Sequence, residues 1–233
     1  MPHSRAVGSD GEQRVPTDEQ PALVLASGSR YRSELLAAAG IAVVIDPPEV
    51  DERAADVLLS VLGPDGLAVE LARRKAQAVA PRHPGRTIVA ADQVGVLASD
   101  SAEPHLLSKQ ADVSGAVTQL MAMSGGRHHL VNGVVVVAPS GAMHAGVDVQ
   151  VVTMRAYGEA EALAYVERFA PFDTSGSYRI EDGEELERIM GPGAALVASV
   201  TGEDPSGVVG LPLPLLRRLL ADADADVGVE RTG

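Results

Sequence analysis

The 233-residue chain is 45% hydrophobic, which is enough for a buried core in one domain. Its 32 acidic and 19 basic residues give a net charge of −13, which argues against binding to nucleic-acid polymers or to an anionic membrane surface. The absence of cysteine excludes disulfides, thiolate metal sites and a thiol nucleophile.

The two ends of the chain look different from its middle. Residues 1–20 are polar, contain acidic residues and show no periodicity, so they predict a disordered tail rather than a signal peptide. No apolar run reaches the roughly 18 residues of a membrane-spanning helix. The sequence therefore predicts a cytoplasmic protein with one domain over residues 21–221 and a frayed tail at 222–233.

The first ordered unit is a strand, a tight turn and a helix. Residues 22–26 form a short apolar run typical of a central strand, and Ser29 can cap the helix after the turn. Arg30 and Arg32 then lie in the first helical turn, where positive side chains oppose the helix dipole. Basic side chains beside free N–H groups suit a phosphate, and the alternative is a plain junction with two solvated arginines.

The next predicted elements are a helix that ends at Gly40, a strand over 41–45 and, after an acidic loop, a helix over 56–80. The loop has four carboxylates between Asp46 and Glu52, and it is either a solvated bend or a place for a cation.

The apolar run 87–91 predicts a buried strand that ends directly in Asp92 and Gln93. An acid at the carboxyl end of a parallel strand lies where open α/β sheets place their chemistry. The alternative is an aspartate in a turn.

The second half predicts helices over 113–123, 159–169 and 214–220, and a strand hairpin of 130–138 with 147–156. The adjacent His128 and His129 point to opposite faces of a strand, so we expect them to be structural or solvent-facing rather than ligands of one metal ion. The segment Glu184–Met190 has the character of an inserted turn or short helix, and residues 194–200 are either helical or extended.

Polar side chains collect at the predicted strand ends and turns: Ser27, Ser29, Arg32, Glu52, Lys75, Asp92 and Lys109. The cations and hydroxyls suit a polyphosphate, and the two carboxylates suit Mg²⁺ or Mn²⁺. Together they predict metal-assisted attack of water on a phosphoanhydride, with a carboxylate taking the proton from water.

Short motifs occur in order along nearly the whole chain: Leu25–Arg32, Pro48–Glu52, Leu71–Ala76, Ala91–Val94, Lys109, Ser124–Val131, Ser175–Tyr178 and Val208–Leu213. This series resembles the Maf family of nucleoside triphosphate pyrophosphatases. The resemblance implies an α/β fold in which a mixed twisted sheet, flanked by helices, forms two lobes around a deep cleft. The family it points to is often homodimeric. The implied reaction cleaves a nucleoside triphosphate between its α- and β-phosphates, with a divalent metal (Mg²⁺, Mn²⁺ or Co²⁺).

By position, the resemblance makes Asp92 the proton acceptor and pairs it with Glu52 as metal ligands. It assigns phosphate binding to a group of hydroxyls and cations: Ser27, Ser29, Arg32, Lys75 and Lys109.

Three further positions, Tyr31, Gln93 and Glu181, match those that the family uses to choose its base. An aromatic residue, Gln and Glu resemble the branch that acts on 7-methyl-GTP, whereas the branch for dTTP and UTP usually has Arg, Thr and Gln. The cationic ring of 7-methylguanine favours an aromatic face, and a carboxylate accepts from N1–H and N2–H₂ of guanine.

The chain departs from the family pattern at Arg30, at Ser108 and Gln110 around Lys109, and at Asn132, where a Thr is usual. These departures and the inserted segment affect the choice of substrate more than the reaction. The alternatives are a dTTP/UTP or broad non-standard nucleotide pyrophosphatase, and a nucleotide-binding regulator of septum formation with little turnover.

Overall fold

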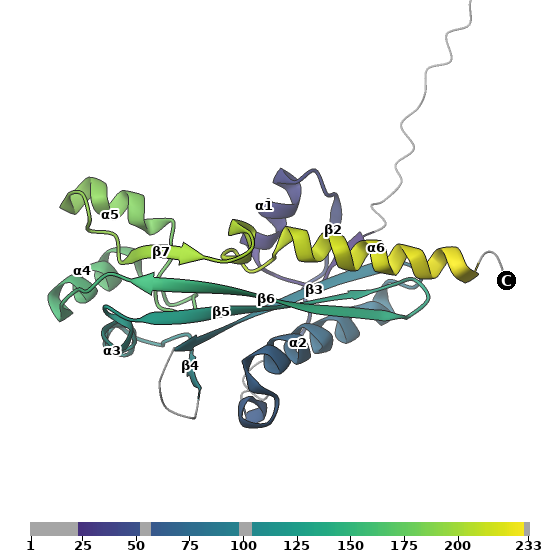
Figure 1. The fold of residues 1–233 in the computed structure, drawn as a ribbon, viewed down its shortest axis with the longest axis horizontal. Coiled ribbons are helices and arrows are strands. Elements are labelled where there is room, and N and C mark those ends of the chain that lie inside the picture. Colours follow the sequence, from purple (N-terminus) through teal and green to yellow (C-terminus); the bar gives the residue numbers. More distant parts are fainter. Residues whose placement is uncertain (1–22, 52–56, 98–103, 231–233) are drawn as a thin grey trace, which may run out of the picture.

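The computed structural model describes residues 23–51, 57–97 and 104–230 (Figure 1). The predicted N-terminal tail and the predicted metal ligand Glu52 therefore lie outside the described residues. Within the described ranges, no helix combines the length and the apolar character that crossing a membrane requires.

A mixed seven-stranded sheet organises the fold, in the order β2-β1-β3-β5-β6-β7 with β4 beside β3. The strands are β1 (Leu23–Leu25), β2 (Val43–Ile45), β3 (Thr87–Leu97), β4 (His105–Leu107), β5 (Arg127–Val137), β6 (Met143–Met154) and β7 (Val197–Thr201). Strand β1 runs parallel to β2 and β3, and the remaining pairs are antiparallel. The predicted mixed α/β sheet is confirmed.

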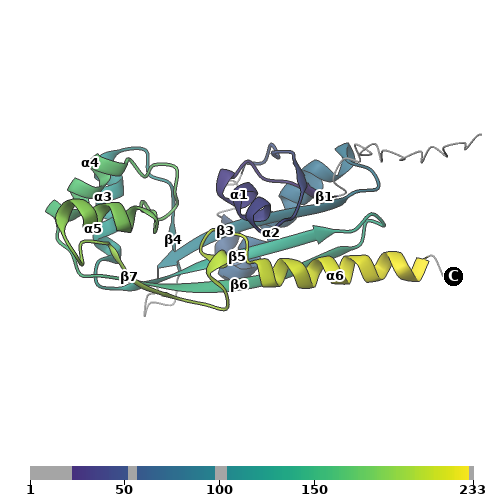
Figure 2. The same cartoon turned by 90° about the horizontal axis from the view of Figure 1, so that it is seen from above.

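Helices flank this sheet on both faces: α1 (Arg30–Ala38), α2 (Leu59–Val79), α3 (Val113–Met123), α4 (Glu159–Phe169), α5 (Asp182–Met190) and α6 (Leu213–Glu230). Because successive side chains of a strand point to opposite faces of the sheet, β3 contributes to two hydrophobic clusters, one on each face. Val94 and Val96 pack with Leu67 and Leu71 of α2, whereas Val89 and Ala91 pack in the cluster that contains Leu216 of α6. Helices α3, α4 and α5 gather at the opposite end of the sheet from the C-terminus (Figures 1 and 2).

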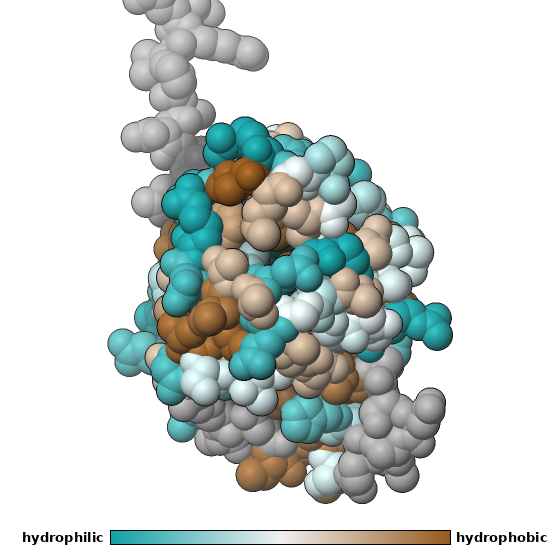
Figure 3. Space-filling model, turned by 90° about the vertical axis from the view of Figure 1, so that its left-hand side faces the viewer, coloured by the Kyte–Doolittle hydropathy of each residue, from teal (hydrophilic) through white to brown (hydrophobic). Residues whose placement is uncertain are grey.

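The end that carries α3, α4 and α5 shows hydrophobic patches among hydrophilic ones (Figure 3). Leu163, Ile189 and Met190 are among its exposed apolar side chains. Scattered exposure of this kind is ordinary for a folded chain.

Strand β3 differs from the sequence prediction, because it does not end at Asp92 but continues to Leu97. On one edge, β1 pairs with residues 87–89 and β4 pairs with residues 95–97. Within the described part of the chain, residues 90–94 have no strand beside them on that edge. Asp92 thus lies at a gap in the sheet rather than at the end of a strand.

The last helix also differs from the prediction, which placed its end at Leu220 and a frayed tail at 222–233. Helix α6 continues to Glu230. Alanine has the highest helix propensity, and Ala223 is buried in the same cluster as Leu216 and Leu219, so both local preference and packing extend the helix. Residues 194–200, left open between helix and strand, contribute the extended β7.

Candidate active site

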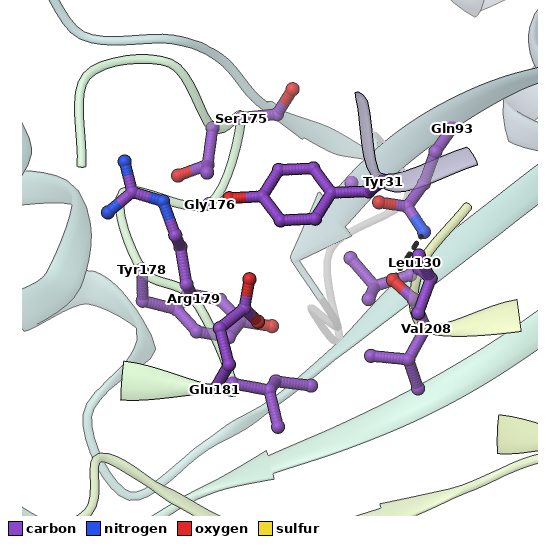
Figure 4. A pocket seen from close by; sticks show the side chains of 13 residues that line it. Tyr31, Gln93, Leu130, Ser175, Gly176, Tyr178, Arg179, Glu181 and Val208 are labelled. Atoms are coloured by element: carbon purple, nitrogen blue, oxygen red, sulfur yellow. Dashed lines mark hydrogen bonds between the residues drawn. The ribbon is translucent and has the colours of Figure 1, made fainter. Parts of the chain in front are cut away.

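A pocket of about 460 Å³ opens between the lobe that contains α1 and the lobe that contains the segment 174–181. We call it the main pocket; Tyr31, Gln93, Leu130, Tyr178, Glu181 and Val208 are among its lining residues (Figure 4). Its volume lies in the range of sites for small organic ligands.

A smaller pocket of about 110 Å³, the side pocket, adjoins the main pocket. Asp92 and Lys109 line it, and Gln93, Gly95 and Ser175 line both pockets. The two pockets therefore share a wall at the gap in the sheet edge, and we call the two together the cleft.

The Ser27–Arg32 turn folds as its sequence predicts. Ser29 caps α1 by accepting a hydrogen bond from the Arg32 N–H at 3.4 Å. The Ser27 hydroxyl accepts from the Ser29 N–H and from Arg32 Nη1, each at 3.2 Å. Buried Arg32 also donates from Nε to the Gly210 carbonyl at 2.9 Å, so this guanidinium joins α1 to a loop far away in sequence.

The two arginines of this turn differ in surroundings. Arg30 is exposed and pairs with Glu34 at 2.7 Å, one helical turn later. Arg32 is buried and is among the lining residues of neither pocket. The alternative of two solvated arginines therefore holds for Arg30 and is wrong for Arg32.

Lys75 and Asp92 form an ion pair between α2 and β3, in which Nζ donates to Oδ1. The side chains are only 8% and 9% exposed. Burial of both partners requires the pair, because an isolated charge would be costly to bury there. Lys109, by contrast, is exposed at the rim of the side pocket.

Tyr31, Gln93 and Glu181 converge on the main pocket from three separate elements. Tyr31 lies on α1 and is 42% exposed, and Glu181 immediately precedes α5. Figure 4 shows the Tyr31 ring and the Glu181 carboxylate within the same hollow. Gln93 donates from Nε2 to Asn132 Oδ1 at 3.0 Å and to the carbonyls of Gly207 and Val208.

Arg179 is a pocket residue that the sequence did not single out. It forms ion pairs with Asp173 and Asp182, and the Tyr165 hydroxyl donates to Asp182 at 2.5 Å. Burial raises the pKa of Asp182. The sequence signal that could have identified Arg179 is its place between the Ser175–Tyr178 motif and Glu181, which the family resemblance had already singled out.

His128 is structural, as predicted. It is fully buried, its Nε2 lies 2.7 Å from the Tyr178 hydroxyl, and its ring meets that of Tyr178 edge-on. Burial lowers the pKa of His128 to about 4. The residue therefore stays neutral and supports a wall of the main pocket.

The described residues contain no group of three or more His, Asp or Glu side chains that would hold a metal unaided. Asp92 offers one carboxylate at the side pocket. Mg²⁺ in nucleotide sites typically takes one or two carboxylates together with substrate oxygens and water, so this donor set fits such an ion.

Comparison with known proteins finds a family profile and relatives that match most of the chain. The sequence profile of the family described as "Maf-like protein" matches residues 22–223. A dTTP/UTP pyrophosphatase from Deinococcus radiodurans is 36% identical over 211 residues, which is 90% of this chain and 96% of that protein. A 7-methyl-GTP pyrophosphatase from Nitrosococcus oceani is 34% identical over 90% of this chain and 96% of that protein. A 7-methyl-GTP pyrophosphatase from Xanthomonas oryzae pv. oryzae is 36% identical over 87% of this chain and 97% of that protein.

Proposed function

The chain belongs to the Maf-like protein family, and on this premise we propose that it hydrolyses a nucleoside triphosphate to the monophosphate and pyrophosphate. One observation carries the proposal: two pockets share a wall, and Asp92, paired with Lys75, lines the side pocket while Tyr31, Gln93 and Glu181 line the main pocket. This arrangement provides separate places for a triphosphate and for a base.

In the proposed reaction, Asp92 accepts a proton from water as the water oxygen forms a bond to the α-phosphorus. The bond from that phosphorus to the bridging oxygen breaks, and pyrophosphate leaves with the electron pair. Lys75, Lys109 and Arg32 supply positive charge to the phosphate oxygens, which is the main need of phosphoryl transfer.

A divalent cation, Mg²⁺, Mn²⁺ or Co²⁺, is part of the proposal, with Asp92 and Glu52 as its protein ligands. When bound, it would supply positive charge to the phosphate oxygens and orient them. The protein's own contribution is to hold the carboxylate of Asp92 in place through Lys75.

The favoured substrate is 7-methyl-GTP. Tyr31 offers an exposed aromatic face to a cationic ring, and Glu181 offers a carboxylate to the N1–H and N2–H₂ groups of guanine. The relatives named for 7-methyl-GTP and for dTTP/UTP are equally similar to this chain, so the proposal rests on these side chains and not on the names.

A substrate panel tests the proposal. Pyrophosphate release would be measured with 7-methyl-GTP, GTP, dTTP and UTP, each with Mg²⁺, Mn²⁺ or Co²⁺. We expect the highest kcat/KM for 7-methyl-GTP. Hydrolysis confined to dTTP and UTP would overturn the choice of base, and tight nucleotide binding without pyrophosphate release would favour the regulatory alternative.

A further inference from the structure

We propose that Asn132, held by Asp148, is a positioning residue that fixes the side-chain amide of Gln93, so that the main pocket offers its base two hydrogen-bond acceptors. The inference rests on the proposed function, because it concerns how the same pocket selects a base. It starts from a row of buried polar side chains that the reaction itself does not use.

The row crosses three neighbouring strands. Gln93 of β3 lies opposite Asn132 of β5, and Asn132 lies opposite Asp148 of β6. Residues that lie opposite one another point to the same face of a sheet, so the three side chains stand side by side. Asn132 is 0% exposed and Asp148 is 7% exposed, so each polar group here needs a protein partner.

The orientation of Asn132 follows from its neighbours. Its Nδ2 donates to Asp148 Oδ2 at 3.0 Å and to the Gly207 carbonyl at 2.8 Å. A backbone carbonyl only accepts hydrogen bonds, so the amide nitrogen must face it. The Oδ1 atom of Asn132 is therefore the atom that faces Gln93.

The orientation of Gln93 follows in turn. Its Nε2 lies 3.0 Å from Asn132 Oδ1, 3.1 Å from the Gly207 carbonyl and 3.2 Å from the Val208 carbonyl. A flipped amide would place Oε1 against these three acceptors, which is unfavourable. Figure 4 shows the result: the nitrogen of Gln93 is turned toward Val208, and its oxygen is turned toward Tyr31.

The same row fixes the loop that closes this side of the pocket. A Cβ atom at Gly207 would overlap Asp148 and Gln150, so the loop backbone rests directly on the row. The loop then continues to Val208 in the pocket wall and to Gly210, whose carbonyl accepts from Arg32. Asn132 is thus tied both to Gln93 and to the loop.

The consequence is a pattern of acceptors in the main pocket. Gln93 Oε1 and the Glu181 carboxylate both accept hydrogen bonds, which matches a base edge with adjacent donors such as N1–H and N2–H₂ of guanine. Uracil and thymine have one N–H between two carbonyls, so they would place an acceptor against an acceptor. Discrimination by such unpaired polar groups is large.

Two variants of nearly identical shape test the inference. In Asn132→Thr, the hydroxyl accepts from Gln93 and donates to Asp148 or to Gly207, whereas the side chain of Asn132→Val does neither. The readouts are the ratio of kcat/KM for 7-methyl-GTP over UTP and, by calorimetry, the ratio of affinities for 7-methyl-GMP over UMP. The second readout needs no turnover.

We expect Asn132→Thr to keep both ratios and Asn132→Val to lower them by roughly 10- to 100-fold. The loss should appear mainly in KM, because Asp92, the neighbour of Gln93 in β3, points to the other face of the strand, where it pairs with Lys75 of α2. Adding Gln93→Met to Asn132→Val should lower the ratios no further than Gln93→Met alone, because Asn132 acts through Gln93.

Unchanged ratios in a folded Asn132→Val protein would overturn the inference, and so would additive effects in the double variant. If Asn132→Val does not fold, the smaller pair Asn132→Ser and Asn132→Ala gives the same comparison. A parent protein that releases no pyrophosphate from any triphosphate would refute the proposed function, while the ratio of monophosphate affinities would still decide the role of Asn132.

Discussion

Lys75 donates from its ammonium to the carboxylate of Asp92 across the interface between α2 and β3, and both side chains are almost fully buried. Burying an ion pair gives little net stability compared with apolar residues of the same volume. Such a pair beside a cleft therefore indicates chemistry more than packing. It is the strongest support for our proposal that the reaction takes place at this point of the sheet.

Replacing Asp92 with Asn should abolish turnover while nucleotide binding persists. The amide keeps the shape of the side chain but cannot accept the proton from water, so kcat should fall by at least roughly 100-fold. The measurements are pyrophosphate release and calorimetric binding of the substrate. Near-normal turnover in Asp92→Asn would remove Asp92 from the proton-accepting role.

The same substitution removes the carboxylate charge beside the buried ammonium of Lys75, so loss of structure must be separated from loss of chemistry. Breaking a buried pair typically destabilises a protein by about 3–5 kcal/mol. The double variant Lys75→Met with Asp92→Asn should recover part of that stability in thermal unfolding but none of the activity. Recovery of turnover in the double variant would show that the charge pair is not needed for the reaction.

Replacing Arg32 with Lys should raise KM, because the single nitrogen of lysine cannot reproduce the planar fork in which Nε donates to Gly210 and Nη1 donates to Ser27. We expect a fall of roughly 10- to 100-fold in kcat/KM, measured by pyrophosphate release, with a small change in melting temperature. Arg30→Lys is the matched control: this neighbour is exposed and pairs only locally with Glu34. Equal effects in the two variants would contradict a specific role for Arg32.

Much of this site was predictable because the informative signals are local. The cap at Ser29 and the positions of Arg32, Lys75 and Asp92 can be recognised from short stretches of chain. The structure pairs Lys75 with Asp92, which lines the side pocket, whereas Ser29 and Arg32 are among the lining residues of neither pocket. The assigned roles of these residues and the implied homodimer stay predictions.

What the sequence did not show depends on contacts between distant residues. The gap beside Asp92 exists because β1 and β4 pair with different parts of β3, and no local pattern around Asp92 encodes that. The partners of Gln93 lie 39, 114 and 115 residues away. The sequence marked Asn132 as a departure from the family pattern, but it did not indicate that this side chain contacts Gln93.

His128 should make stability depend on pH. Its pKa is lowered to about 4 by burial, whereas the unfolded chain has a histidine pKa of roughly 6.5. Below pH 6.5 the unfolded state takes up a proton that the folded state does not, so the free energy of unfolding falls as pH drops. The loss levels off below about pH 4, at about 3 kcal/mol in total.

Denaturant unfolding at several pH values between 7.5 and 4 checks this expectation. His128→Gln should be less stable than the parent at pH 7.5 but should lose less stability on acidification. His129→Gln is the control, because this neighbour points to the other face of β5 and burial is the larger cause of the shift in His128. If His128→Gln lost as much stability on acidification as the parent protein, the pH dependence would come from other titrating groups.

The packing of α2 on the sheet gives the last prediction. A Cβ atom at Gly133 of β5 would overlap the backbone of Ala68 in α2, and a backbone neighbour cannot move aside as a flexible side chain can. Gly133→Ala should therefore destabilise the protein by about 3 kcal/mol or more, because overpacking forces the backbones apart. The free energy of unfolding in urea measures this directly. Gly158→Ala is the matched control, since a Cβ atom there meets nothing within 4 Å, and it should change the stability by less than about 1 kcal/mol.

Because α2 also carries Lys75, a shift of this helix should weaken pyrophosphate release in Gly133→Ala even where the protein stays folded. Equal stability of the two variants would show that α2 does not pack this closely on Gly133.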